Sequence, residues 1–144
     1  MKKLLATILA LVMALSVTTM AWAEEDWTGS GTEADPYVIT TEAGLNKLAT
    51  DVNSGTAYSG KYFKLGASIT VTDWTPIGQK NSENNKFAGT FDGNGQTVTH
   101  NRSKSSLDPA VGGSAGVFGA VQGAPITNLT VAGTISGSDV AGVV

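Results

Sequence analysis

The 144-residue chain contains no cysteine, which removes two common ways of stabilising a small domain. Without thiols there are no disulfide bonds and no zinc sites built on thiolates, so packing and backbone pairing must hold the fold. Histidine is almost as scarce, since His100 is the single one and lies in no HExxH pattern. The sequence therefore predicts neither a metal site nor a bound cofactor.

Basic residues are also few. The chain has nine lysines and arginines and twelve acidic residues, which gives a formal net charge of −3. They form no cluster that could neutralise the phosphates of a nucleic acid or an anionic lipid surface. Nucleic acid is therefore not an expected partner.

The apolar stretch Leu4–Val17 has no charged residue at all. Lys2 and Lys3 precede it, and Ala21-Trp22-Ala23 follows it with the small residues that a signal peptidase requires. A membrane span needs about 20 apolar residues, and Glu24 comes too soon for one. We interpret residues 1–23 as a cleaved signal peptide and expect a secreted or cell-surface bacterial protein without a transmembrane span.

Removal of residues 1–23 leaves 121 of the 144 residues and takes away two lysines, so the net charge becomes −5. Residues 24–35 are polar and glycine-rich, and they predict a flexible lead-in. Residues 36–144 predict one small domain. Its first clear element is an amphipathic helix, Glu42 to Asn53, with an apolar stripe at helical spacing formed by Leu45, Leu48, Ala49 and Val52.

Short β-type segments separated by Gly, Asn, Asp and Ser follow the helix, and two of them resemble each other. Gly89–Gly93 is echoed by Gly116–Ala120 with the phenylalanines 27 positions apart, and Val98 is echoed by Ile126 after 28. A period of 25 to 28 residues favours an all-β fold of the β-solenoid type, in which successive coils stack. An antiparallel sandwich is the alternative.

Several segments together resemble the GLUG-type repeat region of bacterial surface proteins: GTEADPYVIT, YSGKYFKL, WTPIG, FAGTFDGNGQTV, GVFG and ITNLTVAGTISG. The resemblance runs from about Gly31 to Val144. It implies a right-handed parallel β-helix with an N-terminal amphipathic capping helix, as in adhesin-like proteins and in non-catalytic parts of surface peptidases that cleave immunoglobulin A. The last repeat breaks off at Val144, so we expect residues 36–144 to be truncated at the C-terminus, with an open edge that self-associates end to end.

Candidate chemical groups are scattered along the chain. Asp92-Gly93-Asn94-Gly95 has oxygen ligands suited to calcium, but Ser103 stands where an EF-hand loop needs glutamate, so a tight turn is the better interpretation. Asp73, Asp92 and Asp139 are the carboxylates considered for a catalytic pair, and each lies beside turn residues. No nucleophile motif accompanies them. The sequence predicts no catalytic, cofactor-binding or metal-binding residue.

The leading functional hypothesis is a non-catalytic, adhesin-like or structural module that presents a rigid face to a host protein, a matrix protein or a glycan. Trp27, Tyr58 and Tyr62 lie near turns and are candidates for stacking on sugar rings. The alternative is the N-terminal fragment of a larger surface hydrolase, a peptidase or a carbohydrate-active enzyme, with its catalytic part beyond Val144. A purely structural stalk is a third hypothesis.

The signal peptide gives the first testable prediction. Exported protein should begin at Glu24, because the basic residues, the apolar stretch and Ala21-Trp22-Ala23 together specify cleavage after Ala23. Mass spectrometry of secreted material would measure this terminus. Exported protein that keeps Met1 would show that the segment is not cleaved.

Overall fold

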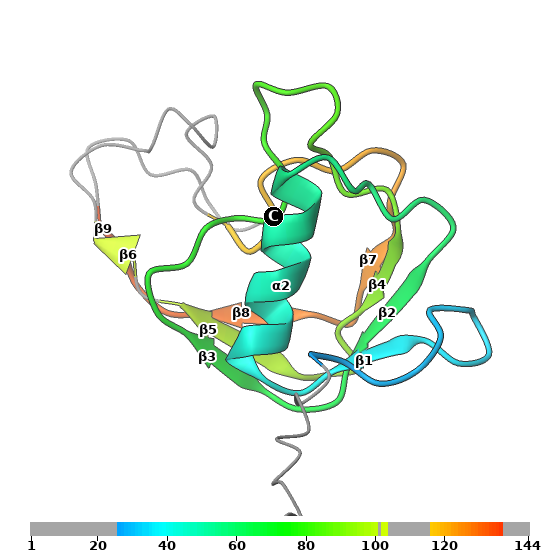
Figure 1. The fold of residues 1–144 in the computed structure, drawn as a ribbon. Helices are drawn as coiled ribbons and strands as arrows, with labels where there is room; N and C mark the ends of the chain where they lie inside the picture. The colour runs from blue at the N-terminus through cyan, green and yellow to red at the C-terminus, as the bar shows by residue number, and fades with distance from the viewer. Residues whose placement is uncertain (1–25, 101, 104–115, 137–144) are drawn as a thin grey trace, which may run out of the picture.

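A computed structural model describes residues 26–100, 102–103 and 116–136, so residues 1–23 and the predicted C-terminal truncation lie outside it (Figure 1). Within these residues, one helix and nine short strands follow one another. They are β1 (Tyr37–Ile39), α2 (Glu42–Asn53), β2 (Tyr62–Leu65), β3 (Ile69–Val71), β4 (Thr90–Asp92), β5 (Thr97–His100), β6 (Arg102–Ser103), β7 (Ile126–Thr127), β8 (Thr130–Ala132) and β9 (Ile135–Ser136).

Helix α2 begins and ends where the sequence predicts. Thr41 is the N-cap, and its hydroxyl accepts a hydrogen bond from the Gly44 backbone N–H at 3.1 Å. Glu42 places its negative charge in the first turn, where the helix dipole favours it. The helix ends at Asn53, and Gly55 follows with a positive φ of 106°. The predicted apolar stripe is buried on one face.

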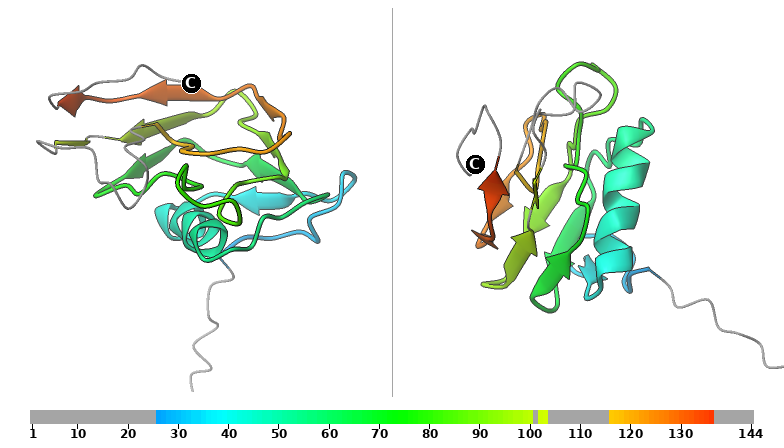
Figure 2. Two further views of the ribbon diagram at one scale, coloured as in Figure 1. Left: turned by 90° about the horizontal axis from the view of Figure 1, so that it is seen from above. Right: turned by 90° about the vertical axis from the view of Figure 1, so that its left-hand side faces the viewer.

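All strand-to-strand pairs are parallel in the part of the chain that the structure describes. They form a four-stranded sheet in the order β1-β2-β4-β7, a three-stranded sheet β3-β5-β8 and a two-stranded sheet β6-β9. The pairing aligns apolar side chains in rows, so that Phe63 lies beside Phe91 and Phe91 beside Ile126. Figure 2 shows the resulting stack, with the cyan helix at one end and the orange strands at the other.

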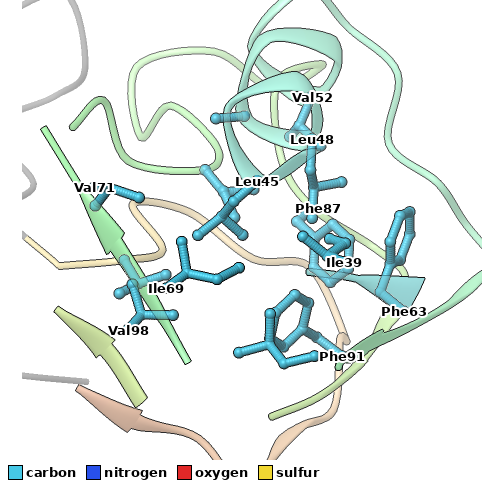
Figure 3. Close-up of a cluster of buried hydrophobic side chains, with 14 of the residues drawn as sticks. Ile39, Leu45, Leu48, Val52, Phe63, Ile69, Val71, Phe87, Phe91 and Val98 are labelled. Carbon is cyan, nitrogen blue, oxygen red and sulfur yellow. The ribbon is translucent and has the colours of Figure 1, made fainter. Parts of the chain in front are cut away.

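The hydrophobic core lies between the two larger sheets and α2 (Figure 3). Leu45, Leu48 and Val52 reach into it from the helix, and Phe63 and Phe91 reach into it from β2 and β4; all five are at most 1% exposed. Trp74 and Phe87, which lie between β3 and β4 in the sequence, are buried in the same core. Because these side chains interdigitate, the helix and the sheets stabilise one another.

The predicted fold class, an all-β right-handed parallel β-helix or β-solenoid, is wrong. The described residues form separate parallel sheets of four, three and two strands together with a packed helix, an architecture that mixes α and β structure. The helix alone contributes four apolar side chains to the buried core. The prediction made it a cap over the first coil of an all-β solenoid, whereas it is part of an interior that mixes α and β structure.

The repeat was also aligned incorrectly. The predicted repeat aligns Phe91 with Phe118, but Phe91 pairs with Ile126, 35 positions later. Phe118 pairs with Ile77, 41 positions earlier. The first two β1-β2 and β2-β4 spacings, 26 and 28, do match the predicted period. The spacing then grows because the chain between β4 and β7 carries additional residues, including 104–115, which lie outside the described part.

The segment before β1, interpreted from the sequence as part of a flexible lead-in, makes defined contacts from residue 26 onward. Thr28 and Val38 exchange two backbone hydrogen bonds as an antiparallel bridge along β1. The Trp27 ring stacks on Tyr37 with a centroid separation of 5.4 Å. The described residues of this segment therefore cover the outer edge of β1.

No described helix has both the length and the apolar composition that crossing a lipid bilayer would require.

The contribution of α2 to the core can be tested with Leu48→Asp. This substitution should cost at least about 3 kcal/mol in the free energy of unfolding, because it buries an unpaired charge at a position that is 0% exposed. Asn46→Asp is the matched control on the exposed face of the same helix and should change stability by less than about 0.5 kcal/mol. Urea unfolding would measure both values, and similar values would exclude a core role for α2.

Candidate functional site

The outer face of the four-stranded sheet carries a groove built by strand alternation. In β2, Phe63 and Leu65 point inward, so Tyr62 and Lys64 point outward. In β4, Phe91 is buried, while Thr90 and Asp92 are partly exposed. The register sets Tyr62 beside Thr90 and Lys64 beside Asp92. Two adjacent strands thus present four polar or aromatic side chains in two rows.

A wall from the segment before β1 turns this face into a groove of about 310 Å³. Glu33, Ala34 and Pro36 form the wall, beside Tyr62 and Lys64. Hydrogen bonds hold the wall in place, since the Asp35 side chain accepts one from the Ser30 N–H at 2.9 Å and the Thr32 hydroxyl accepts one from the Asp35 N–H at 3.1 Å. The groove therefore combines an aromatic ring, carboxylates, an ammonium group and a hydroxyl on a fixed backbone.

Asp92 closes the groove and anchors the turn that follows β4. Its Oδ1 accepts hydrogen bonds from the Asn94 backbone N–H at 2.8 Å and from the Asn128 side chain at 3.0 Å. The side-chain bond from Asn128, then the backbone bond from Asn94, and the charge of Lys64 hold the pKa of this carboxyl below its ordinary value. Asn94 has a φ of 52°, which completes the tight turn predicted for Asp92–Gly95.

The other two aromatic candidates lie in an aromatic cluster. Trp27 contacts Tyr58 and Phe63 edge to face, and Lys47 lies 5.4 Å from the Trp27 ring centroid. The Tyr58 hydroxyl donates a hydrogen bond to Asp51 at 2.7 Å. Burial and then the Asp51 carboxylate raise the pKa of Tyr58 above its ordinary value. Both rings are therefore engaged in structure, and Tyr62 is the candidate that lines a groove.

The carboxylates considered for catalysis are not brought together. Asp73 follows β3 with a φ of 49° and lines a different, polar pocket of about 360 Å³ beside α2, together with Thr50 and Gln79. Asp92 lines the groove described above, and Asp139 lies outside the described residues. His100 is 1% exposed on β5. Within the described residues no three metal-ligating side chains gather.

No family model, curated protein or solved structure matches the chain, so the resemblance to the GLUG-type repeat region stays a prediction.

The sequence indicates Tyr62 as a candidate for stacking on sugar rings, but it does not indicate that Glu33, Lys64 and Thr90 lie beside it in the groove. The alternation Tyr62-Phe63-Lys64-Leu65 already indicates that Tyr62 and Lys64 share a face. Thr90 and Glu33 could not be added, because their positions depend on the parallel register and on the path of the segment before β1.

The anchoring role of Asp92 predicts a pH dependence. Because its pKa is lowered in the folded state, the carboxylate stabilises the fold above the unfolded pKa of about 3.9, and this contribution disappears as the pH falls through the folded pKa. Asp92→Asn should therefore cost about 1 kcal/mol at pH 7, and this cost should become smaller as the pH is lowered toward 2. Denaturant unfolding at stepped pH values would measure the difference.

Asn128→Ala is the companion variant, because it removes the side-chain donor to Asp92. It should reduce the difference that Asp92→Asn causes at pH 7. A stability difference for Asp92→Asn that is the same at pH 7 and pH 2 would show that the ionised carboxylate contributes nothing.

Proposed function

We propose that this protein is a non-catalytic binding module, secreted or displayed on a bacterial surface, whose outer sheet face binds glycans in the Tyr62 groove. The observation that supports this most is the composition of the groove, in which an amphipathic aromatic ring lies among charged and hydroxyl groups. The apolar face of a sugar ring packs on an aromatic ring, while its hydroxyls hydrogen-bond with carboxylates, ammonium groups and hydroxyls.

The size and rigidity of the groove favour a glycan over a protein partner. A volume of about 310 Å³ is at the lower end for small-molecule sites and suits one or two sugar units. Tyr62 and Thr90 are fixed by strand pairing, and Asp92 is fixed by two hydrogen bonds. A preorganised site loses little conformational entropy when it binds a ligand.

The groove also contains two carboxylates, Glu33 and Asp92, which raises the question of glycoside hydrolysis. That reaction needs one carboxyl as a proton donor with a raised pKa, and the lowered pKa of Asp92 does not suit it to this role. Asp92 already accepts two hydrogen bonds through one oxygen. Binding without turnover is therefore the function that we favour. The larger-hydrolase alternative would place its catalytic part outside this sequence and use the same groove as an accessory site.

The proposal predicts that Tyr62 supplies the stacking surface. A glycan array would identify a ligand, and calorimetry with that glycan would then give the affinities of variants. Tyr62→Ala should weaken binding at least about tenfold, while Tyr62→Phe, which keeps the ring, should retain most of it. No glycan should be cleaved by the wild-type protein.

Thr70→Ala is the matched control, because Thr70 is an exposed strand residue on β3, in the other sheet. It should leave glycan affinity unchanged. Absence of binding to every glycan on the array would refute the proposal and favour the structural stalk. Binding to matrix proteins alone would assign this face to a protein partner. Cleavage abolished by Asp92→Asn would show that the groove itself is catalytic and would refute binding without turnover.

A further inference from the structure

The polar cavity of about 360 Å³ that Asp73 lines lies between helix α2 and the chain that follows β3, and we call it the Asp73 pocket (Figure 1). It shares no lining residue with the Tyr62 groove. Most of its polar lining comes from one face of the helix, where the spacing is i, i+4 and i+7, and from three positions of the later chain. These residues are Asn46, Thr50, Asn53, Asp73, Thr75 and Gln79.

Hydrogen bonds between side chains and backbone fix the walls of the Asp73 pocket. The Asn53 side chain donates to the Pro76 carbonyl at 3.0 Å and accepts from the Gly78 backbone N–H at 2.9 Å. The Asn85 side chain donates to the Asn53 carbonyl at 2.6 Å and to the Gln79 side-chain oxygen at 3.2 Å. The end of the helix and the chain after β3 are thereby held together, so a ligand would meet a preorganised site.

The electrostatic character of the Asp73 pocket is negative. Asp73 is the one charged residue among those that line it, and no described lysine or arginine forms an ion pair with its carboxylate. The pocket also lies along the C-terminal half of α2, where the helix dipole is negative, and the last turn of this helix has no basic residue. A cationic ligand is therefore favoured over an anionic one.

The side chains of the pocket suit an ammonium group better than a metal ion. Calcium takes about six to eight oxygen ligands, usually with several carboxylates, whereas a single carboxylate lines this pocket. A primary ammonium group needs one acceptor for each of its N–H donors, and the Asp73 carboxylate, the Thr50 hydroxyl and the Gln79 amide oxygen are acceptors of three kinds. Ala49 and the Thr75 methyl group offer apolar contact to an alkyl stem.

We propose that the Asp73 pocket binds a primary ammonium group carried on a short alkyl chain, with Asp73 as its counter-charge. A free alkylamine and the lysine side chain of another protein share this chemistry. A guanidinium group is less suited, because its planar fork pairs best with both oxygens of one carboxylate, whereas an ammonium group donates in separate directions. This site is independent of the Tyr62 groove and does not rest on glycan binding.

A nuclear magnetic resonance titration of the purified protein tests the proposal. Butylamine, which is protonated at pH 7, should shift the backbone amide signals of Thr50, Asp73 and Gln79 until they saturate. Butanol has the alkyl chain without the charge, and tetramethylammonium has the charge without N–H donors, so each should bind at least about tenfold more weakly. Acetyl-lysine amide separates the two sources: binding tighter than that of butylamine indicates a protein lysine, and weaker binding indicates a free amine.

Asp73→Asn is the decisive variant, because asparagine also adopts the positive φ of 49° found here and keeps the side-chain shape while it removes the charge. It should weaken butylamine binding at least about tenfold, and circular dichroism melting should show that it folds. Glu83→Gln is the matched control, since it removes the same charge from a side chain that is 90% exposed and does not line the pocket. It should leave the affinity unchanged.

The absence of any saturable shift would overturn the proposal, as would butylamine binding that Asp73→Asn leaves intact. Equal affinities for butylamine and butanol would also overturn it. Calcium-dependent shifts of the same signals without amine would assign the pocket to a metal ion instead. None of these outcomes bears on the Tyr62 groove, whose test uses glycans.

Discussion

Parallel pairing between very short strands is the constraint on which the rest of this structure depends. No described strand exceeds four residues, and each pairs with a strand at least 26 positions away. A strand of this length has little stability alone, so each one depends on the neighbour against which it pairs and on the core beneath it. Helix α2 and the segment before β1 support the first strands, and the later strands are built on them in turn.

This dependence explains what could be predicted from the sequence. The bounds of α2 follow from local signals, namely the Thr41 cap, the apolar stripe and the Asn53-Ser54-Gly55 ending. Strand β2 also follows from a local signal, the alternation Tyr62-Phe63-Lys64-Leu65. Strand β6 was missed because Arg102–Ser103 has no apolar pattern and exists through its pairing with β9. The partner of Phe118 was wrong because spacing was treated as constant, whereas parallel pairing tolerates long insertions between strands. The fold class was wrong because the separation of the strands into different sheets and the share of α2 in the core are not local properties of the sequence.

The groove on the sheet illustrates the same division between local and non-local information. Alternation within β2 places Tyr62 and Lys64 on the same face of the sheet, and four consecutive residues are enough to predict this. The sequence predicts Asp92 as a turn residue. Its pairing with Lys64, 28 positions earlier, and its hydrogen bond from Asn128, 36 positions later, depend on the fold. The chemistry of the site arises from that register. A one-position slip would turn Phe63 or Phe91 outward and expose the core, so burial of these rings fixes the groove as well.

The packing of α2 at one end of the strand stack gives the folding reaction a direction. The contacts of α2 with its capping residues are local, while every sheet contact closes a loop of 26 residues or more, which makes the contact order high and folding slow. Once α2, β1 and β2 have formed, β2 offers β4 a template, and β4 then offers one to β7. Each addition closes a loop onto an ordered surface. We therefore expect nucleation in the N-terminal half and propagation toward the uncharged residues 116–136.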